Sequence, residues 1–404
     1  MIDQDPNKKI KPSLVLKSDL HLHLYGSITA DSLWELGKDR HRQLTDRMNW
    51  YVSEYEKAFH IRPDYQSWWN SENNFNEFCK TMQILEPMTF EQFQAKFNLI
   101  IALNPPSHSN LALAKSVFQM NAEVDGIREY RTFIPHFLNA QERELYIESL
   151  LRLAETYDSE ESRILLAFSI DRNLETSLKM YEWLLYFLKK NKWAEPFVTG
   201  IDFCASEYGH SPESKRQFFE TFFRDKTDKI HSFDLMYHVG EMWSQMSIWT
   251  SIRWIENAVS MGVSRIGHGL SAGIQTGALL GTIMIEDLRD FKEHCAWLKR
   301  NEHELNQYGY GKNMVDEYIT NAVIQFDRVT WTMTESLCLN VYAFQNAILK
   351  MLRKLNPVFE VCLTSNLRLG GLKHVQDHAI HRFLGAGLQT IFATDDPGIF
   401  DITL

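Results

Sequence analysis

"DLHLHLYGS" occupies residues 19–27 and follows the apolar run "SLVLKS" near the start of the chain. In an extended backbone, successive side chains alternate between two faces, so His21 and His23 project to one side and the leucines around them to the other. Two neutral imidazoles on one face suit a metal ion. A His-x-His pair is a weak signal on its own, because it also arises by chance. Partners elsewhere in the chain must decide its meaning.

Strand-like runs recur along the chain and alternate with stretches of helical periodicity. Alternating strands and helices predict parallel strands joined by right-handed crossovers, and eight such units close a (β/α)8 TIM-type barrel. The second run, "REYRTFIP", is the weakest because it is polar and could instead end a helix. The eight expected strands fall within residues 13–23, 128–135, 164–171, 197–203, 233–241, 264–269, 358–366 and 388–396.

Two connections are longer than a barrel needs, and we expect one domain over residues 1–404 with insertions at about 40–100 and 271–355. The first insertion is rich in aromatic residues ("YQSWWNSENNFNEF"). The second contains "IEDLRDFKEHCAWL", where one helical stripe carries Ile285, Leu288, Phe291, Cys295 and Leu298. Such a stripe either caps the barrel or forms an oligomer surface.

Composition narrows the class of protein. A chain of 404 residues that is 44% hydrophobic can bury a large core. Its formal net charge of -10 and the absence of a Lys/Arg-rich run argue against a nucleic-acid surface. The first residues, "MIDQDPNKKIKPS", lack the apolar stretch of a signal peptide, and no long apolar span follows, so we expect a soluble, cytoplasmic protein. The five cysteines form no Cys-x-x-Cys pair, which predicts reduced thiols rather than disulfides or a zinc finger.

Reactive side chains fall at the carboxyl ends of several expected strands, where barrel enzymes assemble their sites. His238 and Glu241 lie in "HVGE", His268 lies in "SRIGHG", and Asp395 and Asp396 lie in "TDDPGIF". The sequence therefore predicts that these side chains converge in space with the two histidines of the first strand.

This set suits a hydrolytic zinc site, which takes three or four nitrogen and oxygen ligands and keeps a position for water. We expect His21, His23, His238 and Asp395 as ligands. Glu241 then lies near the metal as an acid, His268 orients the water, and Asp396 bonds a ring nitrogen of the substrate. The remaining histidines singled out are read as ordinary polar groups: His41, His60, His108, His231, His294 and His303.

The motifs "LHLHLYGS", "HVGE", "SRIGHG" and "TDDPGIF", with "SIDR" and "EVCLTSN", resemble the adenosine deaminase family of metal-dependent hydrolases. The resemblance spans nearly the whole chain apart from the two insertions. It implies one zinc ion on His21, His23, His238 and Asp395. It also implies that Glu241 protonates purine N1, that His268 positions the hydroxide, and that Asp396 bonds N7.

Within the wider superfamily, binuclear relatives usually carry a carboxylated lysine at strand four. The corresponding segment here, "GIDFCASE", contains no lysine, so one metal ion is expected rather than two. The other zinc deaminase design, with a Pro-Cys-x-x-Cys signature, is absent.

The sequence departs from the family where substrate is bound. The family's Asp after His-x-His-Leu, which bonds the ribose 5′-hydroxyl, is Tyr25 here. A carboxylate repels a 5′-phosphate whereas a phenol does not, so AMP or ATP is an alternative to adenosine. Candidate phosphate-binding cations are Arg172, Arg368 and Lys373. The family's purine-contacting glycine after strand four is replaced in "DFCASE", where Ala205 or Cys204 could narrow the pocket.

The chain stops just past the eighth expected strand, where the family continues into further helices, so we expect a fragment of a longer protein. The insertions, Tyr25 and the early end also resemble deaminase subunits of RADAR-type antiphage systems. That resemblance implies adenine nucleotide substrates, a large homo-oligomer and an ATPase partner. Two alternatives stay open: a metal hydrolase of another amide or ester, and an inactive deaminase-like scaffold.

Overall fold

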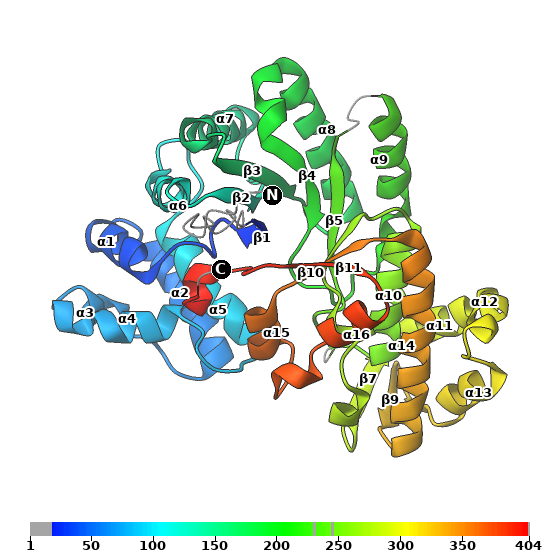
Figure 1. Ribbon diagram of the computed structural model, residues 1–404. Coiled ribbons are helices and arrows are strands. Elements are labelled where there is room, and N and C mark those ends of the chain that lie inside the picture. The colour runs from blue at the N-terminus through cyan, green and yellow to red at the C-terminus, as the bar shows by residue number, and fades with distance from the viewer. Residues whose placement is uncertain (1–17, 229–231, 244–245, 403–404) are drawn as a thin grey trace, which may run out of the picture.

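The computed structural model describes residues 18–228, 232–243 and 246–402, and a ring of parallel strands surrounded by helices forms its centre (Figure 1). The eight strands are ordered β1-β2-β3-β4-β5-β6-β10-β11. The first and last strands meet where Leu22 pairs with Asp395, and the His23 backbone N–H donates to the Asp395 carbonyl at 2.8 Å. The ring therefore closes, which confirms the predicted (β/α)8 barrel.

The barrel strands lie within or beside the runs that predicted them. Residues 13–17 of the first expected strand lie outside the described residues. The seventh run is only half strand, because its second half begins helix α15 (Leu363–Leu369). The strands are β1 (Asp19–His23), β2 (Gly126–Phe133), β3 (Ser162–Ser169), β4 (Val198–Phe203), β5 (Asp234–Val239), β6 (Arg265–His268), β10 (Val358–Val361) and β11 (Gln389–Phe392).

The polar run that was the weakest strand prediction is strand β2. Its charged residues are not on a solvent face: Glu129 and Arg131 are 2% and 1% exposed. Arg265 of β6 pairs with Glu129 across the barrel at 2.9 Å. Charges of both signs thus neutralise one another inside the barrel, which is why a polar sequence can form an interior strand.

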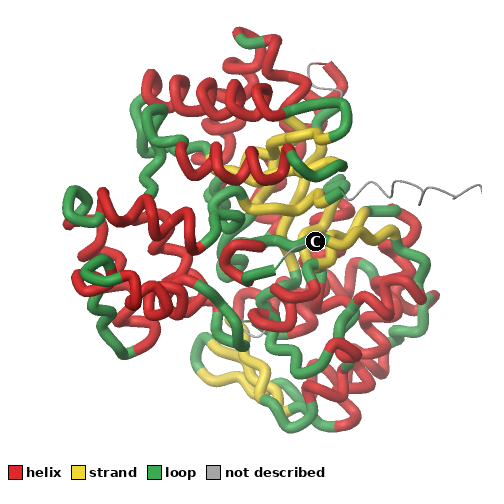
Figure 2. Tube along the Cα trace, turned by 60° about the vertical axis from the view of Figure 1, so that its left-hand side comes forward, coloured by secondary structure: helices red, strands yellow, loops and turns green. Residues whose placement is uncertain are grey.

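Helices cover the outside of the ring (Figures 1 and 2). Several begin with a side-chain cap, for example Asn139 before α7 and Ser247 before α10, whose oxygens accept backbone N–H groups of the first turn. The helices outside the two long connections are α7 (Ala140–Tyr157), α8 (Leu174–Lys190), α9 (Arg216–Asp228), α10 (Ile248–Ser260), α15, α16 (Ile380–Gly385) and α17 (Pro397–Phe400).

The connection between β1 and β2 is helical. Its aromatic residues build a local core in which Trp34 lies 5.2 Å from Phe78, measured between ring centroids. Helix α5 begins with a capping box formed by Thr89 and Gln92 and runs back toward the barrel. The helices are α1 (Ala30–Arg40), α2 (Thr45–Phe59), α3 (Tyr65–Trp68), α4 (Phe75–Met82), α5 (Phe90–Leu103) and α6 (Ala112–Ala122).

The connection between β6 and β10 contains a small antiparallel sheet, ordered β7-β9-β8, which lies apart from the barrel strands (Figure 2). The expected helical stripe from Ile285 is wrong at its start, because Ile285 lies in β7 and is 48% exposed. Alternation of β-branched residues sets this strand before the helix begins. The elements are β7 (Ile283–Asp287), α11 (Leu288–Arg300), α12 (Glu302–Gln307), α13 (Lys312–Thr320), β8 (Val323–Gln325), β9 (Arg328–Thr332) and α14 (Glu335–Leu355).

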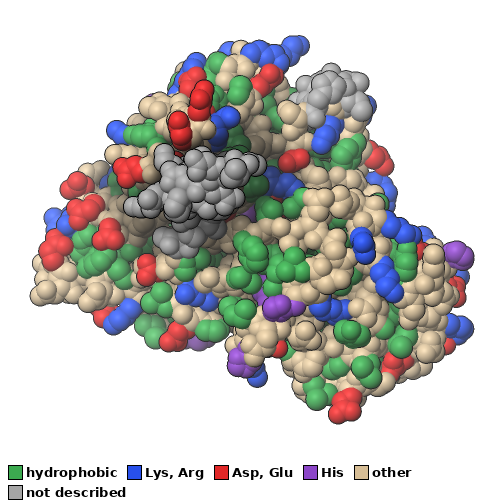
Figure 3. Space-filling view, viewed as in Figure 1, with side chains coloured by type: hydrophobic (Ala, Val, Ile, Leu, Met, Phe, Trp, Pro, Cys, Tyr) green, Lys and Arg blue, Asp and Glu red, His purple; other side chains and the backbone are tan. Residues whose placement is uncertain are grey.

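The surface and the thiols agree with the composition. Acidic and basic side chains are interspersed on the face shown in Figure 3. All five cysteines are free. Among the described residues, no helix has the length and apolar character needed to cross a membrane.

Candidate active site

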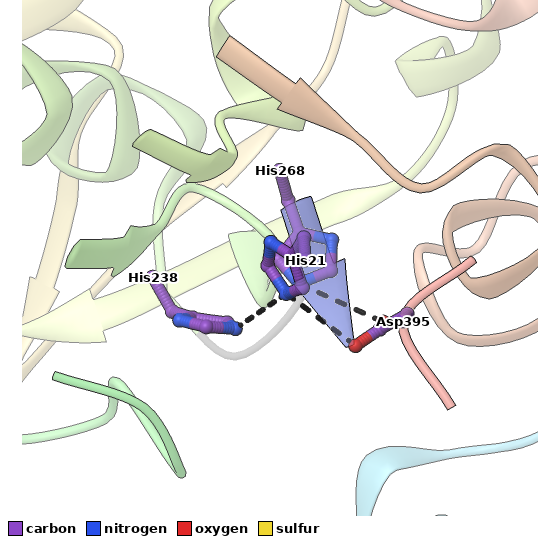
Figure 4. A group of neighbouring side chains, drawn as sticks. All are labelled: His21, His238, His268 and Asp395. Atoms are coloured by element: carbon purple, nitrogen blue, oxygen red, sulfur yellow. Dashed lines mark hydrogen bonds and ion pairs between the residues drawn. The ribbon is translucent and has the colours of Figure 1, made fainter. Parts of the chain in front are cut away.

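Four buried side chains from four strand ends meet at the carboxyl rim of the barrel. They are His21 of β1, His238 of β5, His268 of β6 and Asp395 after β11, and one ligand atom from each lies within 4.8 Å of the others. Figure 4 shows the three imidazoles and the carboxylate pointing toward one another. Residues far apart in the sequence thus converge where a barrel enzyme places its chemistry.

His23 borders this group from the second position of the His-x-His pair. Its Nε2 atom lies 3.2 Å from Nε2 of His238 and 3.3 Å from Oδ1 of Asp395. The four residues expected as metal ligands are therefore neighbours, and His268, expected to orient water, lies 3.9 Å from Asp395 Oδ2.

Two of these residues occupy a strained backbone conformation. His268 has φ +64° and Asp395 has φ +68°, in the left-handed region that side chains with a Cβ rarely adopt. His268 is the last residue of β6, and Asp395 follows three residues after the end of β11, where it bridges to Leu22 of β1. The surrounding structure holds both in this conformation, as is common where side chains must be aimed into a site.

Buried carboxylates hold two imidazoles from behind. His21 Nδ1 lies 2.6 Å from Glu360 Oε2, and His238 Nδ1 lies 3.1 Å from Asp202. Burial raises the pKa of Asp202, but His238 and Arg131 offset this effect and hold the pKa well below its usual range. An ionised carboxylate only accepts hydrogen bonds, so each Nδ1 is the donor.

With Nδ1 donating, the Nε2 atoms of neutral His21 and His238 present lone pairs to each other at 3.0 Å. Two lone pairs at this distance repel unless a positive charge lies beside them. Burial and the Arg131 charge lower the pKa of His21, yet Glu360 and Asp395 more than compensate and raise it to about 9. The cluster therefore attracts one positive charge, and its nitrogen and carboxylate donors fit a divalent metal ion.

Two further imidazoles of the site, His23 and His268, have lowered pKa values. Burial lowers the pKa of His23 to about 3, and it lowers the pKa of His268 well below its ordinary value. Neutral imidazole is the form that ligates metals.

Glu241 lies beside the cluster, with Oε2 3.5 Å from His268 Nε2. Burial raises the pKa of Glu241 well above its ordinary value, and the negative charges of Asp395 and Glu207 raise it further. Glu207 also accepts the backbone N–H groups of Gly240, Glu241 and Met242 at 2.7, 2.9 and 3.1 Å. A carboxyl group with a raised pKa is thus held on a fixed turn at the rim.

A cavity of about 250 Å³ opens beside these groups. The predicted substrate-binding residues Tyr25, Ala205 and Asp396 all line it. Asp396 Oδ1 is buried and has no hydrogen-bond partner within the described part of the chain. Burial, with the charges of Asp395 and Glu241, raises the Asp396 pKa well above its ordinary value. Helix α5 contributes an aromatic wall of Phe90, Phe93 and Phe97.

The suggested phosphate-binding arginines are engaged elsewhere. Arg172 donates to the carbonyls of Phe203, Cys204 and His238, and Arg368 donates to those of Ile84 and Phe400. Neither arginine lines the cavity, and nor does Lys373. Among the described residues that line it, Arg131 alone is cationic.

Sequence reasoning missed the residues that orient the cluster. Asp202, Glu360 and Arg131 were not singled out, and neither was Asn366, whose amide lies 3.0 Å from His268 Nδ1. A signal was present, because a charged residue in the middle of an apolar strand ("GIDF", "VFEV") needs a buried partner.

Comparisons with known proteins point in one direction. Residues 311–404 match the family model described as Adenosine deaminase. A segment of 58 residues is 40% identical to an aminodeoxyfutalosine deaminase of Acidothermus cellulolyticus, covering 14% of this chain and 16% of that protein. A segment of 53 residues is 38% identical to an adenosine deaminase-like protein of Drosophila melanogaster, covering 13% of this chain and 16% of that protein. The matched segments thus span only 16% of the length of these curated relatives.

Solved structures share the fold over most of the chain. An adenine deaminase from Arthrobacter aurescens superposes with a TM-score of 0.55 at 14% identity, covering 95% of this chain and 83% of its own. Arabidopsis ADAL complexed with IMP also gives 0.55, at 16% identity, covering 96% of this chain and 83% of its own. An Arabidopsis N6-mAMP deaminase superposes with a TM-score of 0.55 at 16% identity, covering 96% of this chain and 84% of its own. At these identities the likeness shows the fold alone.

Proposed function

We propose, from the premise that the chain is adenosine deaminase-like, that it is a metal-dependent hydrolase releasing ammonia from C6 of an adenine nucleoside or nucleotide. The observation that carries the proposal is the cluster of imidazoles and Asp395 at the barrel rim, with the Glu241 carboxyl beside it. Burial raises the pKa of Glu241, which suits an acid. The matched family segment and the deaminase relatives support the reaction class.

The metal ligands in this proposal are His21, His23, His238 and Asp395, and the metal is one zinc ion. When bound, zinc supplies Lewis acidity and lowers the pKa of a water ligand to about 7. Two contacts support this assignment. A carboxylate holds the Nδ1 atom of His21 and another holds that of His238, and the Nε2 atoms of the two rings lie close together.

Glu241 protonates ring N1, which makes C6 electrophilic. This role needs a carboxyl group that keeps its proton at neutral pH, and the raised pKa of Glu241 supports it. His268 is neutral and stands 3.5 Å from Glu241 Oε2, so it can orient the attacking water toward C6. Asp396, whose pKa is also raised, can donate its proton in a hydrogen bond to N7, an atom that only accepts.

The substrate lies in the cavity lined by Tyr25 and Ala205. Nucleoside and nucleotide both remain within the proposal: the aromatic wall and the scarcity of cations favour an uncharged sugar, whereas the solved relative with IMP favours a nucleotide.

The test is turnover by zinc-loaded protein, followed as ammonia release and as the ultraviolet shift from adenine to hypoxanthine. Adenosine, AMP and ATP are assayed side by side, with N6-methyl-AMP added because one solved relative is an N6-mAMP deaminase. Turnover of any of these supports the proposal. Silence on all of them, with zinc bound, overturns it in favour of a scaffold, and hydrolysis of a simple amide or ester alone overturns it in favour of another hydrolase.

A further inference from the structure

Arg131 of β2 lies inside the barrel beneath the metal-type cluster and is 1% exposed. Its Nε donates to Asp202 Oδ2 at 2.9 Å, and its Nη2 donates to Glu360 Oε2 at 2.6 Å. Its Nη1 donates to the backbone carbonyl of Leu20, next to the His-x-His pair. One guanidinium group therefore joins three strands of the barrel.

The two carboxylates that Arg131 joins are the two that hold imidazoles of the cluster. Glu360 Oε2 accepts from His21 Nδ1 at 2.6 Å, and Asp202 accepts from His238 Nδ1 at 3.1 Å. The direction in which each Nε2 points thus depends on a carboxylate whose own position depends on Arg131.

We propose that Arg131 is a positioning residue that aims the Nε2 atoms of His21 and His238 at one point, through Glu360 and Asp202. The inference rests on the metal site of the proposed function and adds how that site is held. A guanidinium suits the role because its donors form a rigid planar fork, whereas a lysine ammonium is a compact charge on a flexible stem.

Arg265 provides the matched comparison within the same buried network. Its Nε donates to Glu360 Oε1 at 2.6 Å, and its Nη1 donates to Glu129 at 2.9 Å. It neutralises Glu360 as Arg131 does, but the residues it contacts in the described part of the chain do not include Asp202. If the arginines only neutralise charge, replacing either should have the same effect on metal binding. If Arg131 bridges Glu360 and Asp202, replacing it should have the larger effect.

The experiment compares Arg131→Lys with Arg265→Lys in the whole chain. Zinc affinity is measured by competition with a chromophoric chelator, and ligand geometry by the visible absorption of the Co²⁺-loaded protein. We expect Arg131→Lys to weaken zinc binding about 10- to 100-fold and to shift the Co²⁺ spectrum, as loss of a partner that orients metal ligands does. Arg265→Lys should stay within about threefold of wild type, since both imidazole-holding carboxylates keep Arg131. Equal losses in both variants, or unchanged affinity in Arg131→Lys, overturn the proposal.

If Arg131→Lys does not fold, Asp202→Asn carries the test by nuclear magnetic resonance of the zinc-loaded protein. Cutting Asp202 from Arg131 should shift the Nδ1 proton of His21, which Asp202 does not hydrogen-bond, as well as that of His238. A change confined to His238 overturns the bridge. Failure of the proposed function reads differently: wild type then binds zinc without turnover, while the affinity difference between the two arginine variants remains.

Discussion

The barrel rim and the connection between β6 and β10 both bury ionisable side chains, but their hydrogen-bond partners differ. At the barrel rim, carboxylates accept hydrogen bonds from the Nδ1 atoms of His21 and His238. The Nε2 atoms of these two rings face one another 3.0 Å apart beside a cavity. In the second region, Glu286 of β7 is 1% exposed but its oxygens accept from Ser247 Oγ and from Tyr318 OH at 3.1 Å. Side chains are buried in both regions, but at the rim the Nε2 atoms of His21 and His238 face each other, whereas the Glu286 oxygens accept hydrogen bonds from hydroxyl groups.

The histidines repeat this contrast. His294 of α11 is fully buried, and neither ring nitrogen has a hydrogen-bond partner among the residues that the structure describes. Its neighbours are the rings of Trp297, Tyr318 and Phe344, and within the described parts of the chain it forms no ion pair with a carboxylate. Burial of a histidine or a carboxylate therefore indicates a functional site only when its hydrogen-bond partners are also known.

The strongest test of the difference between the two regions replaces one acidic residue in each. Glu241→Gln should lower kcat by about 10²- to 10⁴-fold, because the amide cannot give a proton to N1. Glu286→Gln should leave kcat and bound zinc near wild type. Initial rates and zinc content of both variants are the measurement.

A Glu241→Gln enzyme with wild-type turnover contradicts the assigned acid. Loss of zinc in that variant would mean that Glu241 is a ligand and not the proton donor. Equal loss of turnover in both variants would mean that the two regions act as one structural unit.

The second comparison removes one imidazole from each region. His238→Ala should weaken zinc binding by at least about 100-fold, more than the loss of an orienting partner, because a direct ligand disappears. His294→Ala should cost stability but leave zinc affinity unchanged, since His294 lies among aromatic rings. Chelator competition gives the affinities, and thermal denaturation gives the stability. Weakened zinc binding in His294→Ala would contradict the division into two regions.

The sequence predicted the barrel because strand signals recur between helical stretches, and because reactive residues stood at the carboxyl ends of those strands. It predicted the convergence of His21, His238 and Asp395 for the same reason, since parallel strands of a barrel end at one rim. The roles assigned to these residues await the measurements above.

The sequence did not predict the buried ion pairs, because the two partners of each pair lie far apart in the chain. Glu129 and Arg131 made β2 look unlike a strand, because their partners come from strands far away in the chain. Asp202 and Glu360 were passed over as single charges in apolar runs. The small sheet was missed since β7 and β8 are short, and Ile285 continues the period of the helix that follows it. Long-range pairing, and not local pattern, decides each of these cases.

Glu286 also gives its region a pH dependence of its own. Burial raises the pKa of Glu286 from 4.5 to about 7, and the hydroxyl groups around it offset only part of this effect. Below the pKa of Glu286 in the unfolded chain, the carboxyl group is protonated in the folded and the unfolded state, so the free energy of unfolding has its full value. As pH rises through about 7 the unfolded chain holds fewer protons, and stability is lost. Between about pH 5 and pH 7 the loss is about 2 kcal/mol.

The measurement is the free energy of unfolding by urea at several pH values, for wild type and for Glu286→Gln. Gln cannot ionise, so the difference between the two proteins should grow by about 2 kcal/mol across this window. A difference that is flat with pH contradicts the raised pKa of Glu286.

The smallest expected effect concerns Ala205, which lines the cavity at the barrel rim. Its φ of +69° is strained for a side chain with a Cβ, and its methyl group lines the cavity. Ala205→Gly removes that strain but adds freedom to the unfolded chain, so a net gain of about 0.5 kcal/mol is expected. The matched control is Ala343→Gly in helix α14, which should lose about 1 kcal/mol because the same exchange there relieves nothing. If Ala205→Gly is destabilised like its control, the methyl group packs usefully. If it gains stability and changes KM for bulkier adenine compounds, the strain is kept for the shape of the cavity, as the left-handed residues His268 and Asp395 at the same rim suggest.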